Sequence, residues 1–597
     1  MHNTDDRLFV LHFYKALQRV TILDPTCGSG AFLFAAMNIL EPLYEVCIER
    51  MQEFNAQNPN WFKPELEEIA HKYRSNIQYF IYKSIILRNL YGVDIMVEAT
   101  EIAKLRLFLK MMAVVEVDFR ADNLGLDPLP DIDFNIRCGN TLVGYATEDE
   151  LLKDLDNPSD FNQMWANDEF KDKLKTEMQL VATAYDTFKT VQFTQSEDMV
   201  TFKQAKRGLN ERLGKLNELL NRRLHAATTS IPYEDWLEKH QPYHWLAEFY
   251  QIIHDNGGFD VIIGNPPYVT FTDKSIPYNV DKFETKKDKN LFALVGEQCT
   301  IISNSKSSVG YIIPLSGLSI EGFKEFQRII FKQRDSWNSF YSGDRNPSEL
   351  FTGVKIRAGI FISRPQSSGR KFVTKYIKYY TSERPILFNK INYTECFDYI
   401  SAPKLDKEIG KNVVTKIFSF DKKLSSEFYK EESIYYHAAP IYWCKALINL
   451  KILTENNLNI AGSYKKIDIS NRYKNFAFIL LNSTLFFYFW IAFSDCYNLT
   501  QKYFSMFRIP NVCDNSELKK VAKELSNDMI KNMSVAEYNY KNNGMVRFAQ
   551  FFPKLSKPII DEIDKILAKY YGFTEEELDF IINYDIKYRM GDELNEE

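Results

Sequence analysis

The sequence predicts an α/β fold in which a doubly wound, mostly parallel sheet carries a helical insertion and is followed by a C-terminal domain of mixed α+β structure. Short apolar runs alternate with helical patterns over residues 20–150, and the alternation resumes at 259–363. Polar, helix-favouring sequence interrupts it at about 151–255, and basic segments rich in Tyr, Phe and Asn replace it beyond about 370. Repeated strand, crossover helix and parallel strand are typical of a doubly wound sheet.

The elements of the first domain follow in order from apolar runs and helical spacing. We expect strands at 20–24, 90–94 and 135–139, with helices from Ala31 onward, up to Asn89 and over 98–112. Leucines at helical spacing over 204–225 predict an amphipathic helix, packed as a hairpin inserted into the sheet domain. The sheet then returns with strands at 259–264, 309–314 and 358–363 and helices from Asn290 and near 320–333.

The domain boundary is expected at 365–385. This gives a sheet domain at 1–370, with its insertion, and a second domain at 371–597 whose C-terminus is helical and acidic. The 597 residues suffice for several hydrophobic cores. With 45% hydrophobic and 26% charged residues, the composition excludes wholesale disorder and fibrous repeats.

Charge is unevenly distributed along the chain. The net charge is −5, yet 361–510 contains 22 Lys and Arg against 12 Asp and Glu. A basic block inside an acidic protein is either a footprint for a polyanion or a soluble basic face. The chain is also rich in aromatic residues, with 45 Phe, 35 Tyr and 7 Trp, which supply flat faces for packing or for stacking on bases.

Cysteines and apolar runs bear on the compartment. The eight cysteines form no C-x-x-C pair, which argues against a disulfide framework or a structural zinc and fits a reducing cytoplasm. The apolar stretch 476–493 is almost long enough to cross a bilayer. Asn482, Ser483 and Thr484 interrupt it, so we expect a buried helix–turn–helix rather than a membrane span.

A glycine-rich turn follows the first predicted strand. Asp24 ends the strand, and Pro25-Thr26-Cys27-Gly28-Ser29-Gly30 leads into a helix. Glycines there let a ligand approach the backbone closely. The turn lacks the third glycine of a dinucleotide fingerprint and the Gly-Lys-Ser/Thr of a phosphate loop, which disfavours NAD and ATP. Asp94, at the end of the next strand, is placed to bind two ribose hydroxyls or, alternatively, to cap the following helix.

A second motif, Asn265-Pro266-Pro267-Tyr268, follows the strand at 259–264. Two prolines fix the backbone and remove two N–H donors, so the carbonyls of the turn are rigid and free to accept hydrogen bonds. Asn265 adds an acceptor and Tyr268 adds a flat face. Two rigid acceptors beside an aromatic ring suit an exocyclic amino group on a planar molecule.

Together the two motifs resemble a known enzyme family. Asp-Pro-Thr-Cys-Gly-Ser-Gly-Ala-Phe-Leu followed by Asn-Pro-Pro-Tyr is similar to the S-adenosylmethionine-dependent DNA adenine-N6 methyltransferases of the gamma class. The similarity is greatest to the large ones that belong to type II restriction–modification enzymes or are fused within them. Segments from Leu480 and from Phe573 also look like C-terminal parts of those enzymes. The order of cofactor motif, Asn-Pro-Pro-Tyr and C-terminal target-recognition region is the gamma arrangement.

The resemblance implies a Rossmann-like methyltransferase domain, S-adenosylmethionine as cofactor and double-stranded DNA as partner, in the cytoplasm of a bacterium or archaeon. The residues implied in cofactor binding are Asp24, Thr26, Gly28, Gly30, Asp94 and Asn140. Of these, Asp24, Gly28 and Gly30 would line the methionine part and Asp94 would bind the ribose. Asn140 stands where the family usually has an Asp that touches the cofactor adenine.

The resemblance also implies a catalytic group made of Asn265, Pro266, Pro267 and Tyr268. The Asn265 side-chain oxygen and the Pro266 carbonyl would accept the two hydrogens of adenine N6, and Tyr268 would stack on the extruded base. Phe351 resembles the aromatic residue that packs on the other face of the base, although a core phenylalanine fits that position equally well. Neither a metal nor a strong general base is expected.

The chain departs from the family at its N-terminus. It begins about 20 residues before the cofactor turn, and the Thr-Pro pair common in the preceding segment is not found. Either residues 2–19 are a shortened version of that segment, or the chain is a fragment or one half of a split enzyme, and an N-terminal segment or a partner subunit then completes the site. No carboxylate–carboxylate–Lys constellation for a nuclease is evident. The rival interpretations are a protein-glutamine N5-methyltransferase, N4-cytosine methylation, and a catalytically silent DNA-recognition subunit.

Overall fold

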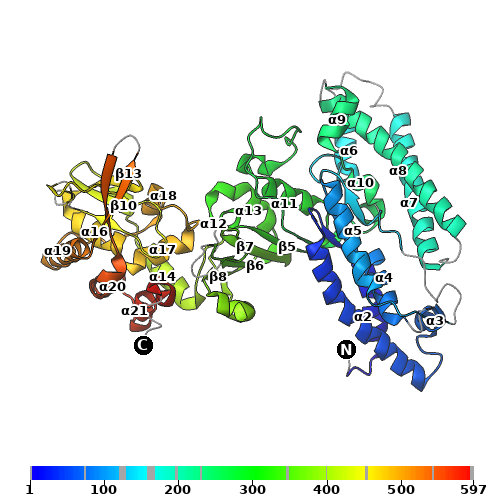
Figure 1. The fold of residues 1–597 in the computed structure, drawn as a ribbon, viewed down its shortest axis with the longest axis horizontal. Helices are drawn as coiled ribbons and strands as arrows, with labels where there is room; N and C mark the ends of the chain where they lie inside the picture. Colours follow the sequence, from blue (N-terminus) through cyan, green and yellow to red (C-terminus); the bar gives the residue numbers. More distant parts are fainter. Residues whose placement is uncertain are drawn as a thin grey trace. The chain divides into compact units, whose positions relative to one another are not determined.

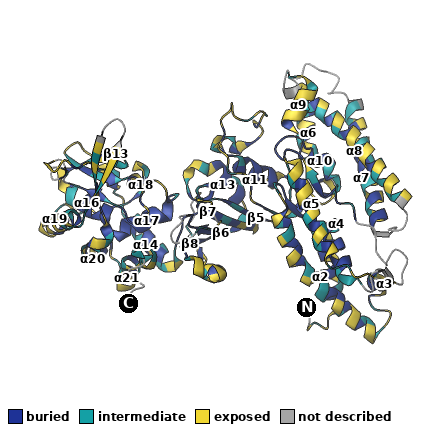
Figure 2. Cartoon of the chain, viewed as in Figure 1, coloured by how far each residue is buried: buried dark blue, intermediate teal, exposed yellow. Residues whose placement is uncertain are grey.

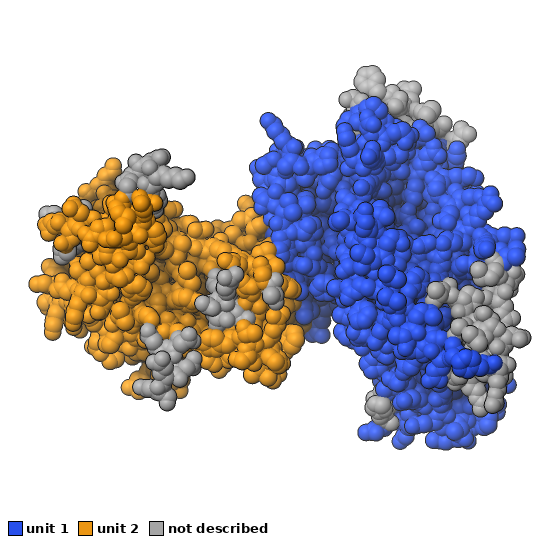
Figure 3. Space-filling model, viewed as in Figure 1, with its two compact units in different colours: residues 1–313, 325–335, 361–369 blue, residues 314–324, 336–360, 370–597 orange. Residues whose placement is uncertain are grey.

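The computed structural model describes residues 3–591 except 73–75, 118, 120–129, 157–167, 195–198, 229–230, 344–348, 352, 367, 398–399, 449, 451–452, 454 and 541–543 (Figure 1). The chain forms two compact units (Figure 3). Unit 1 comprises residues 1–313, 325–335 and 361–369, and unit 2 comprises 314–324, 336–360 and 370–597.

A nine-stranded sheet has the order β3-β2-β1-β4-β5-β7-β6-β8-β9. Its strands are β1 (Ile22–Asp24), β2 (Leu90–Asp94), β3 (Ile136–Cys138), β4 (Phe259–Gly264), β5 (Ser303–Pro314), β6 (Arg334–Tyr341), β7 (Ala358–Pro365), β8 (Lys371–Ile377) and β9 (Thr394–Glu395). β1 pairs in parallel with β2 and β4, β2 with β3, and β4 with β5. β6 and β8 are also parallel, whereas β8 and β9 are antiparallel. The predicted doubly wound, mostly parallel α/β sheet is confirmed.

The helices of unit 1 bury their apolar faces around this sheet. Outside the insertion they are α1 (Arg7–Arg19), α2 (Ala31–Gln57), α3 (Lys63–Lys72), α4 (Ile77–Arg88), α5 (Val97–Met112), η3 (Glu284–Asp288), α11 (Leu291–Ile301) and α13 (Lys324–Phe331). Leu33, Met37, Tyr44 and Met51 of α2 are fully buried in the same core cluster as residues of α1, α4 and α5. Such burial stabilises each side chain by roughly 1.5–3 kcal/mol.

The insertion is helical, as its composition predicts. It holds α6 (Glu148–Leu155), α7 (Asp168–Thr194), α8 (Met199–Thr228), α9 (Tyr233–His240), α10 (Trp245–Glu248) and the π-helix η2 (Gln251–Asp255). α7 and α8 lie side by side as a hairpin (Figure 1). Leu209, Leu213, Leu216 and Leu220 of α8 are all buried, so the predicted amphipathic helix over 204–225 is confirmed.

Unit 2 contains two small antiparallel sheets and many helices. The first sheet has the order β11 (Ala446–Leu447), β10 (Glu432–His437), β12 (Tyr464–Ile469), and the second pairs β13 (Ser534–Tyr540) with β14 (Gly544–Gln550). The helices are α12 (Leu315–Ser319), η4 (Glu321–Phe323), η5 (Thr381–Lys390), α14 (Lys407–Phe418), η6 (Leu424–Glu427), η7 (Asn471–Tyr473), α16 (Lys474–Asn482), α17 (Thr484–Phe493), α18 (Gln501–Met506), α19 (Ser516–Lys531), η8 (Pro553–Ser556), α20 (Lys557–Tyr571), α21 (Glu575–Ile582) and α22 (Ile586–Arg589).

The apolar stretch at 476–493 is the core of unit 2. α16 and α17 meet at a 68° bend, and the residues of this stretch are buried (Figure 2). Ser483 makes the bend because its hydroxyl accepts the Phe486 N–H at 3.0 Å and so caps α17. The predicted buried helix–turn–helix is confirmed. Among the described helices, α2 is long and apolar enough to cross a membrane. The bent pair α16–α17 would also be long and apolar enough if it formed one span.

Candidate active site

The strand order reverses between β1 and β4, and this reversal places the candidate site. In doubly wound sheets ligands bind outside the carboxyl ends of the strands at such a switch point. A β-carbon added to Gly264, the last residue of β4, would lie 3.1 Å from Asp24 Oδ1 and 3.7 Å from Thr26 Oγ1. Glycine therefore lets the end of β4 approach the turn after β1, and Asn265 begins directly beside that turn.

The glycine-rich turn is held by Asp94. Gly28 has a φ of +50° and Gly30 a φ of +77°, in the left-handed region that glycine adopts without strain. The N–H of Gly28 donates to Asp94 Oδ2 at 2.8 Å, and the N–H of Met96 donates to Asp94 Oδ1 at 2.9 Å. One carboxylate thus ties the turn after β1 to the end of β2. A β-carbon on Gly28 would meet nothing within 4 Å, so space is open at this point.

Asp24 is a buried carboxyl group at the centre of the site. It is 1% exposed and accepts the Thr26 N–H at 3.1 Å. Burial raises the pKa of Asp24 to about 7, and the nearby charge of Asp94 acts in the same direction. Two carboxylates so close together favour a cationic ligand, because a positive charge stabilises the ionised form of both.

Asn140 lies in the loop after β3. It is buried, and its Oδ1 accepts the Leu142 N–H at 3.1 Å. Its Nδ2 has no acceptor within hydrogen-bonding distance among the described residues, although the Tyr278 hydroxyl lies near enough to interact with this side chain. The Thr141 hydroxyl donates to the Pro25 carbonyl at 2.6 Å, which holds this loop against the glycine-rich turn.

The Asn-Pro-Pro-Tyr turn is open to solvent. Asn265 and Pro267 are exposed, Pro266 is buried and Tyr268 is partly buried. The Tyr268 hydroxyl contacts Asn265 Oδ1 and donates to the Ile312 carbonyl of β5 at 2.9 Å. Burial raises the pKa of Tyr268, so the hydroxyl remains protonated near neutral pH. The ring is therefore held beside β5. A hydroxyl carries one hydrogen, so Tyr268 can occupy at most one of the two lone pairs of Asn265 Oδ1, and at least one stays available.

Phe351 belongs to unit 2. Its side chain is 37% exposed, and it forms a short bridge with Val354. Its role opposite Tyr268 stays a prediction. The other predicted site residues all belong to unit 1, and they converge from the carboxyl ends of β1, β2, β3 and β4.

Several positioning residues were missed by sequence reasoning. Gly264 permits the approach of β4, Thr141 fastens the loop after β3, and the Ile312 carbonyl orients Tyr268. The signal for Gly264 was a glycine immediately before Asn-Pro-Pro-Tyr. Ile95 is 46% exposed and directly follows Asp94, the residue proposed to bind the ribose. It offers an apolar face at that position. No sequence signal distinguished Thr141 or Ile312.

The fold and the site define a class. A doubly wound sheet, a glycine-rich turn after β1, an acid after β2 and a cation-favouring pair of carboxylates suit S-adenosylmethionine, whose sulfonium and amino groups carry positive charge. The open space at Gly28 fits this group too. Over the described ranges no group of three or more His, Cys, Asp or Glu side chains is arranged to hold a metal ion. These features of unit 1 together fit a methyltransferase domain that uses S-adenosylmethionine.

Comparisons with known proteins show which families parts of this chain are similar to. Residues 88–344 match the Eco57I restriction-modification methylase family, and residues 2–150 match the MmeI DNA-methyltransferase domain. A putative type II restriction enzyme and methyltransferase of Methanocaldococcus jannaschii, RM.MjaORFECS2P, is 28% identical in an alignment over 387 residues that covers 59% of this chain and 30% of that protein. The chain thus spans less than a third of this relative. Together the two matched regions span residues 2–344 and are similar to the methyltransferase domains of restriction–modification enzymes.

Solved structures also resemble the chain, at low identity. The type IIL restriction-modification enzyme MmeI in complex with DNA is 11% identical, with a TM-score of 0.44, over 98% of this chain and 75% of that chain. The M protein of the type I restriction enzyme EcoKI is 11% identical, with a TM-score of 0.25, over 61% of this chain and 44% of that chain.

Proposed function

We propose that this protein methylates N6 of an adenine extruded from double-stranded DNA, as a site-specific modification enzyme of a restriction–modification or phage-defence system in the cytoplasm. The observation that supports this most strongly is the approach of β4 to β1. A β-carbon on Gly264 would lie 3.1 Å from Asp24, so the Asn265 side chain starts at the edge of the cofactor turn. An amino group held by Asn265 therefore lies beside the cofactor.

In this proposal Asn265 Oδ1 and the Pro266 carbonyl accept the two N6 hydrogens. The N6 lone pair is delocalised into the adenine ring, which makes it a poor nucleophile. Two acceptors in fixed positions favour a pyramidal nitrogen with its lone pair directed at the methyl donor. Because the prolines fix the backbone, the acceptors need no reorganisation as positive charge develops on nitrogen. The cofactor would supply an electrophilic methyl group on a sulfonium, which would become a neutral thioether as the methyl group leaves. The methylated nitrogen would release one of its protons to solvent, because Asn265 lies at an exposed turn.

Tyr268 holds the base in place. Extruding an adenine costs a few kcal/mol of unstacking, and base–aromatic stacking returns about 1–3 kcal/mol. The ring is oriented by the hydroxyl bond to Ile312, and the protonated hydroxyl acts as a donor rather than as a base. Phe351 would pack on the other face of the base. Asp24, Gly28 and Gly30 would line the methionine part of the cofactor, Asp94 would bind its ribose and Asn140 would touch its adenine. Thr26, in the same turn as Gly28, is also proposed to bind the cofactor.

Single-molecule sequencing of host DNA, with and without the protein, tests this function because it reports the modified base and its sequence context together. We expect N6-methyladenine at one short recognition sequence only when the protein is present. Methylation at cytosine N4 would overturn the adenine assignment. An unmodified genome, together with methylation of a protein glutamine by the purified enzyme, would overturn DNA as the substrate.

A further inference from the structure

Three apolar residues lie exposed at a bend of η5 in unit 2. Pro385 is exposed, Ile386 is 52% exposed and Phe388 is 75% exposed, whereas Leu387 is buried. The backbone of Ile386, with a φ of −106° and a ψ of 16°, departs from helical values, so the chain bends at this residue. We call Pro385, Ile386 and Phe388 the η5 tip.

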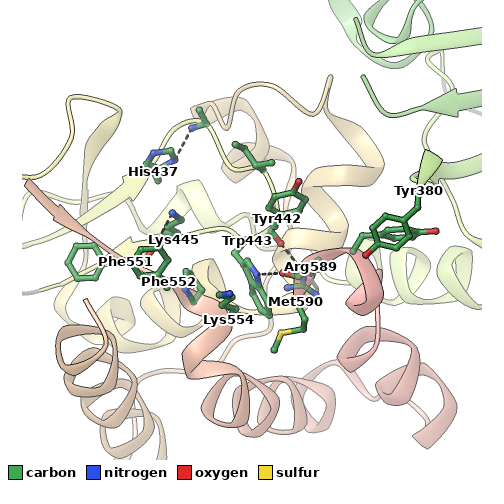
Figure 4. Close-up of a pocket in the computed structure, with 15 residues that line it drawn as sticks. Tyr380, His437, Tyr442, Trp443, Lys445, Phe551, Phe552, Lys554, Arg589 and Met590 are labelled. Atoms are coloured by element: carbon green, nitrogen blue, oxygen red, sulfur yellow. Dashed lines mark hydrogen bonds between the residues drawn. The ribbon is translucent and has the colours of Figure 1, made fainter. Parts of the chain in front are cut away.

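Contacts on either side hold the η5 tip in place. Leu387 lies in a small apolar cluster whose other buried members are Tyr341, Ile377 and Tyr379. Tyr380, just before η5, donates its N–H to Glu383 Oε2 at 2.7 Å. Its ring lies 5.3 Å from that of Tyr588 of α22, and both residues line a cavity of unit 2 (Figure 4). A tip held in this way loses little conformational freedom when it meets a partner.

A second exposed apolar segment lies against η5. The Arg384 guanidinium donates to the Leu350 carbonyl at 2.8 Å, and Leu350 packs on the cluster that buries Leu387. Phe351 follows Leu350 and pairs with Val354, and both side chains are exposed. The η5 tip and this segment therefore place several exposed apolar side chains in one part of unit 2. Exposed apolar residues that gather in this way indicate a binding surface.

The stretch of chain that carries this surface is basic. Among the charged residues of 349–395 that are not buried, seven are Lys or Arg and three are Glu. Within η5, Glu383 bonds Lys390 at 2.7 Å and Lys587 at 3.0 Å, so two cations share one carboxylate. Arg384, next to the η5 tip, bonds a neutral carbonyl. An excess of positive charge beside exposed apolar groups attracts a polyanion.

We infer that the η5 tip is an apolar wedge that enters double-stranded DNA and packs between neighbouring bases. The inference rests on the proposed function, which makes DNA the substrate. Phe, Ile and Pro are among the residues that such wedges use, and their insertion unstacks a base step. Extruding a base requires unstacking, and contact of the Phe388 ring with a base would offset part of that cost. An apolar protein surface would leave the cations beside the tip without an opposite charge, so the basic surroundings favour DNA.

The test compares two short duplexes of the same length, one fully paired and one with a single abasic site. Both carry the same phosphates, so the electrostatic part of the binding free energy is common to them. Insertion is easier where a base is missing, so the ratio of the two affinities reports on the wedge. Fluorescence anisotropy measures both affinities for the full chain, for Phe388→Ala and for Phe388→Trp, which keeps a flat ring. Phe9→Ala is the matched control, because Phe9 is 47% exposed and belongs to unit 1.

We expect the wild type and Phe388→Trp to bind the abasic duplex about tenfold more tightly than the paired one. In Phe388→Ala the ratio should fall to about one, while Phe9→Ala should leave it unchanged. A ratio that does not respond to Phe388→Ala would show that the inference is wrong. Light scattering on the same preparations covers the other kind of partner: a lower particle mass in Phe388→Ala, with the ratio retained, would assign the tip to a protein interface instead of DNA.

The wedge and the proposed chemistry can fail separately, because the DNA titrations involve no methyl transfer. If no N6-methyladenine forms but the ratio still falls in Phe388→Ala, the adenine chemistry is wrong and the wedge is supported. If N6-methyladenine forms and the ratio does not respond, the wedge is wrong and the proposed function stands.

Discussion

At the scale of single residues, the site depends on groups whose ordinary chemistry is shifted by burial. Asp24 has a pKa of about 7 because it is buried beside Asp94. In the free protein the ionised carboxylate is therefore costly, and stability falls as pH rises from the unfolded value of 3.8 through 7. A cationic ligand reverses this preference, so cofactor binding requires Asp24 to lose its proton.

Cofactor affinity should consequently rise with pH. We expect S-adenosylmethionine to bind about tenfold more tightly at about pH 8 than at about pH 6, with release of a proton. Calorimetry in two buffers of different ionisation enthalpy measures both quantities. In Asp24→Asn this pH dependence should disappear along with most of the affinity. If the cofactor affinity of the wild type and of the variant changed equally with pH, a group other than Asp24 would be responsible.

The two glycines of the turn should respond differently to alanine. In Gly28→Ala the new methyl group meets no atom within 4 Å, so only the left-handed backbone is strained, which costs about 1–2 kcal/mol. In Gly30→Ala the methyl also lies 3.0 Å from Ala103 Cβ, so the loss of stability should be greater. Thermal unfolding of the two variants measures which substitution lowers the stability more. Cofactor titration should show that Gly28→Ala, despite its milder destabilisation, weakens binding because its methyl occupies the open space of the site.

At the scale of elements, the broken helix pair α16–α17 depends on a buried acid. Asp564 of α20 accepts the Thr484 N–H at 3.1 Å and the Leu485 N–H at 3.3 Å, at the start of α17. These donors have no partner within α17 because they belong to its first turn. The apolar stretch can bend and stay buried because Ser483 and Asp564 accept hydrogen bonds from the N–H groups at the start of α17.

Asp564→Ala should therefore destabilise unit 2. Leaving two buried N–H groups unsatisfied costs roughly 2–6 kcal/mol. Differential scanning calorimetry should show a lower transition temperature for the part of the chain that contains α17. Cofactor affinity, which depends on unit 1, should change little. A variant that keeps the wild-type transition would mean that Asp564 contributes nothing to the helix start.

Elements were predicted better than the contacts between them. β4 was expected at 259–264, as found, and the bend at Ser483 followed from polar residues inside an apolar run. The contact of Gly264 with Asp24 was not predictable, because it depends on β4 pairing with β1, which is distant in sequence.

At the scale of the whole molecule, the uneven distribution of charge along the chain indicates different roles for unit 1 and unit 2. The methyltransferase motifs lie in unit 1, whereas most of the basic block at 361–510 lies in unit 2. We expect this block to contact DNA phosphates. The logarithm of the DNA affinity should fall linearly with the logarithm of salt concentration, with a slope of about −0.9 per phosphate contact.

Fluorescence anisotropy over a range of salt concentrations measures that slope. Replacing two exposed lysines of the block, Lys423 and Lys430, by Gln should reduce it, while the same change at Lys519 and Lys520 of α19, outside the block, should not. An affinity for DNA that does not change with salt would contradict this assignment of the basic block.

The central claim is that the Asn-Pro-Pro-Tyr turn holds an adenine amino group beside the cofactor turn. The most direct test transfers a labelled methyl group to DNA and identifies the methylated nucleoside by mass spectrometry, for the wild type and for Asn265→Ala, with cofactor affinity measured on the same preparations. The account predicts N6-methyldeoxyadenosine from the wild type. In the variant it predicts none, with cofactor affinity kept within about twofold. Undiminished methylation by Asn265→Ala would contradict it.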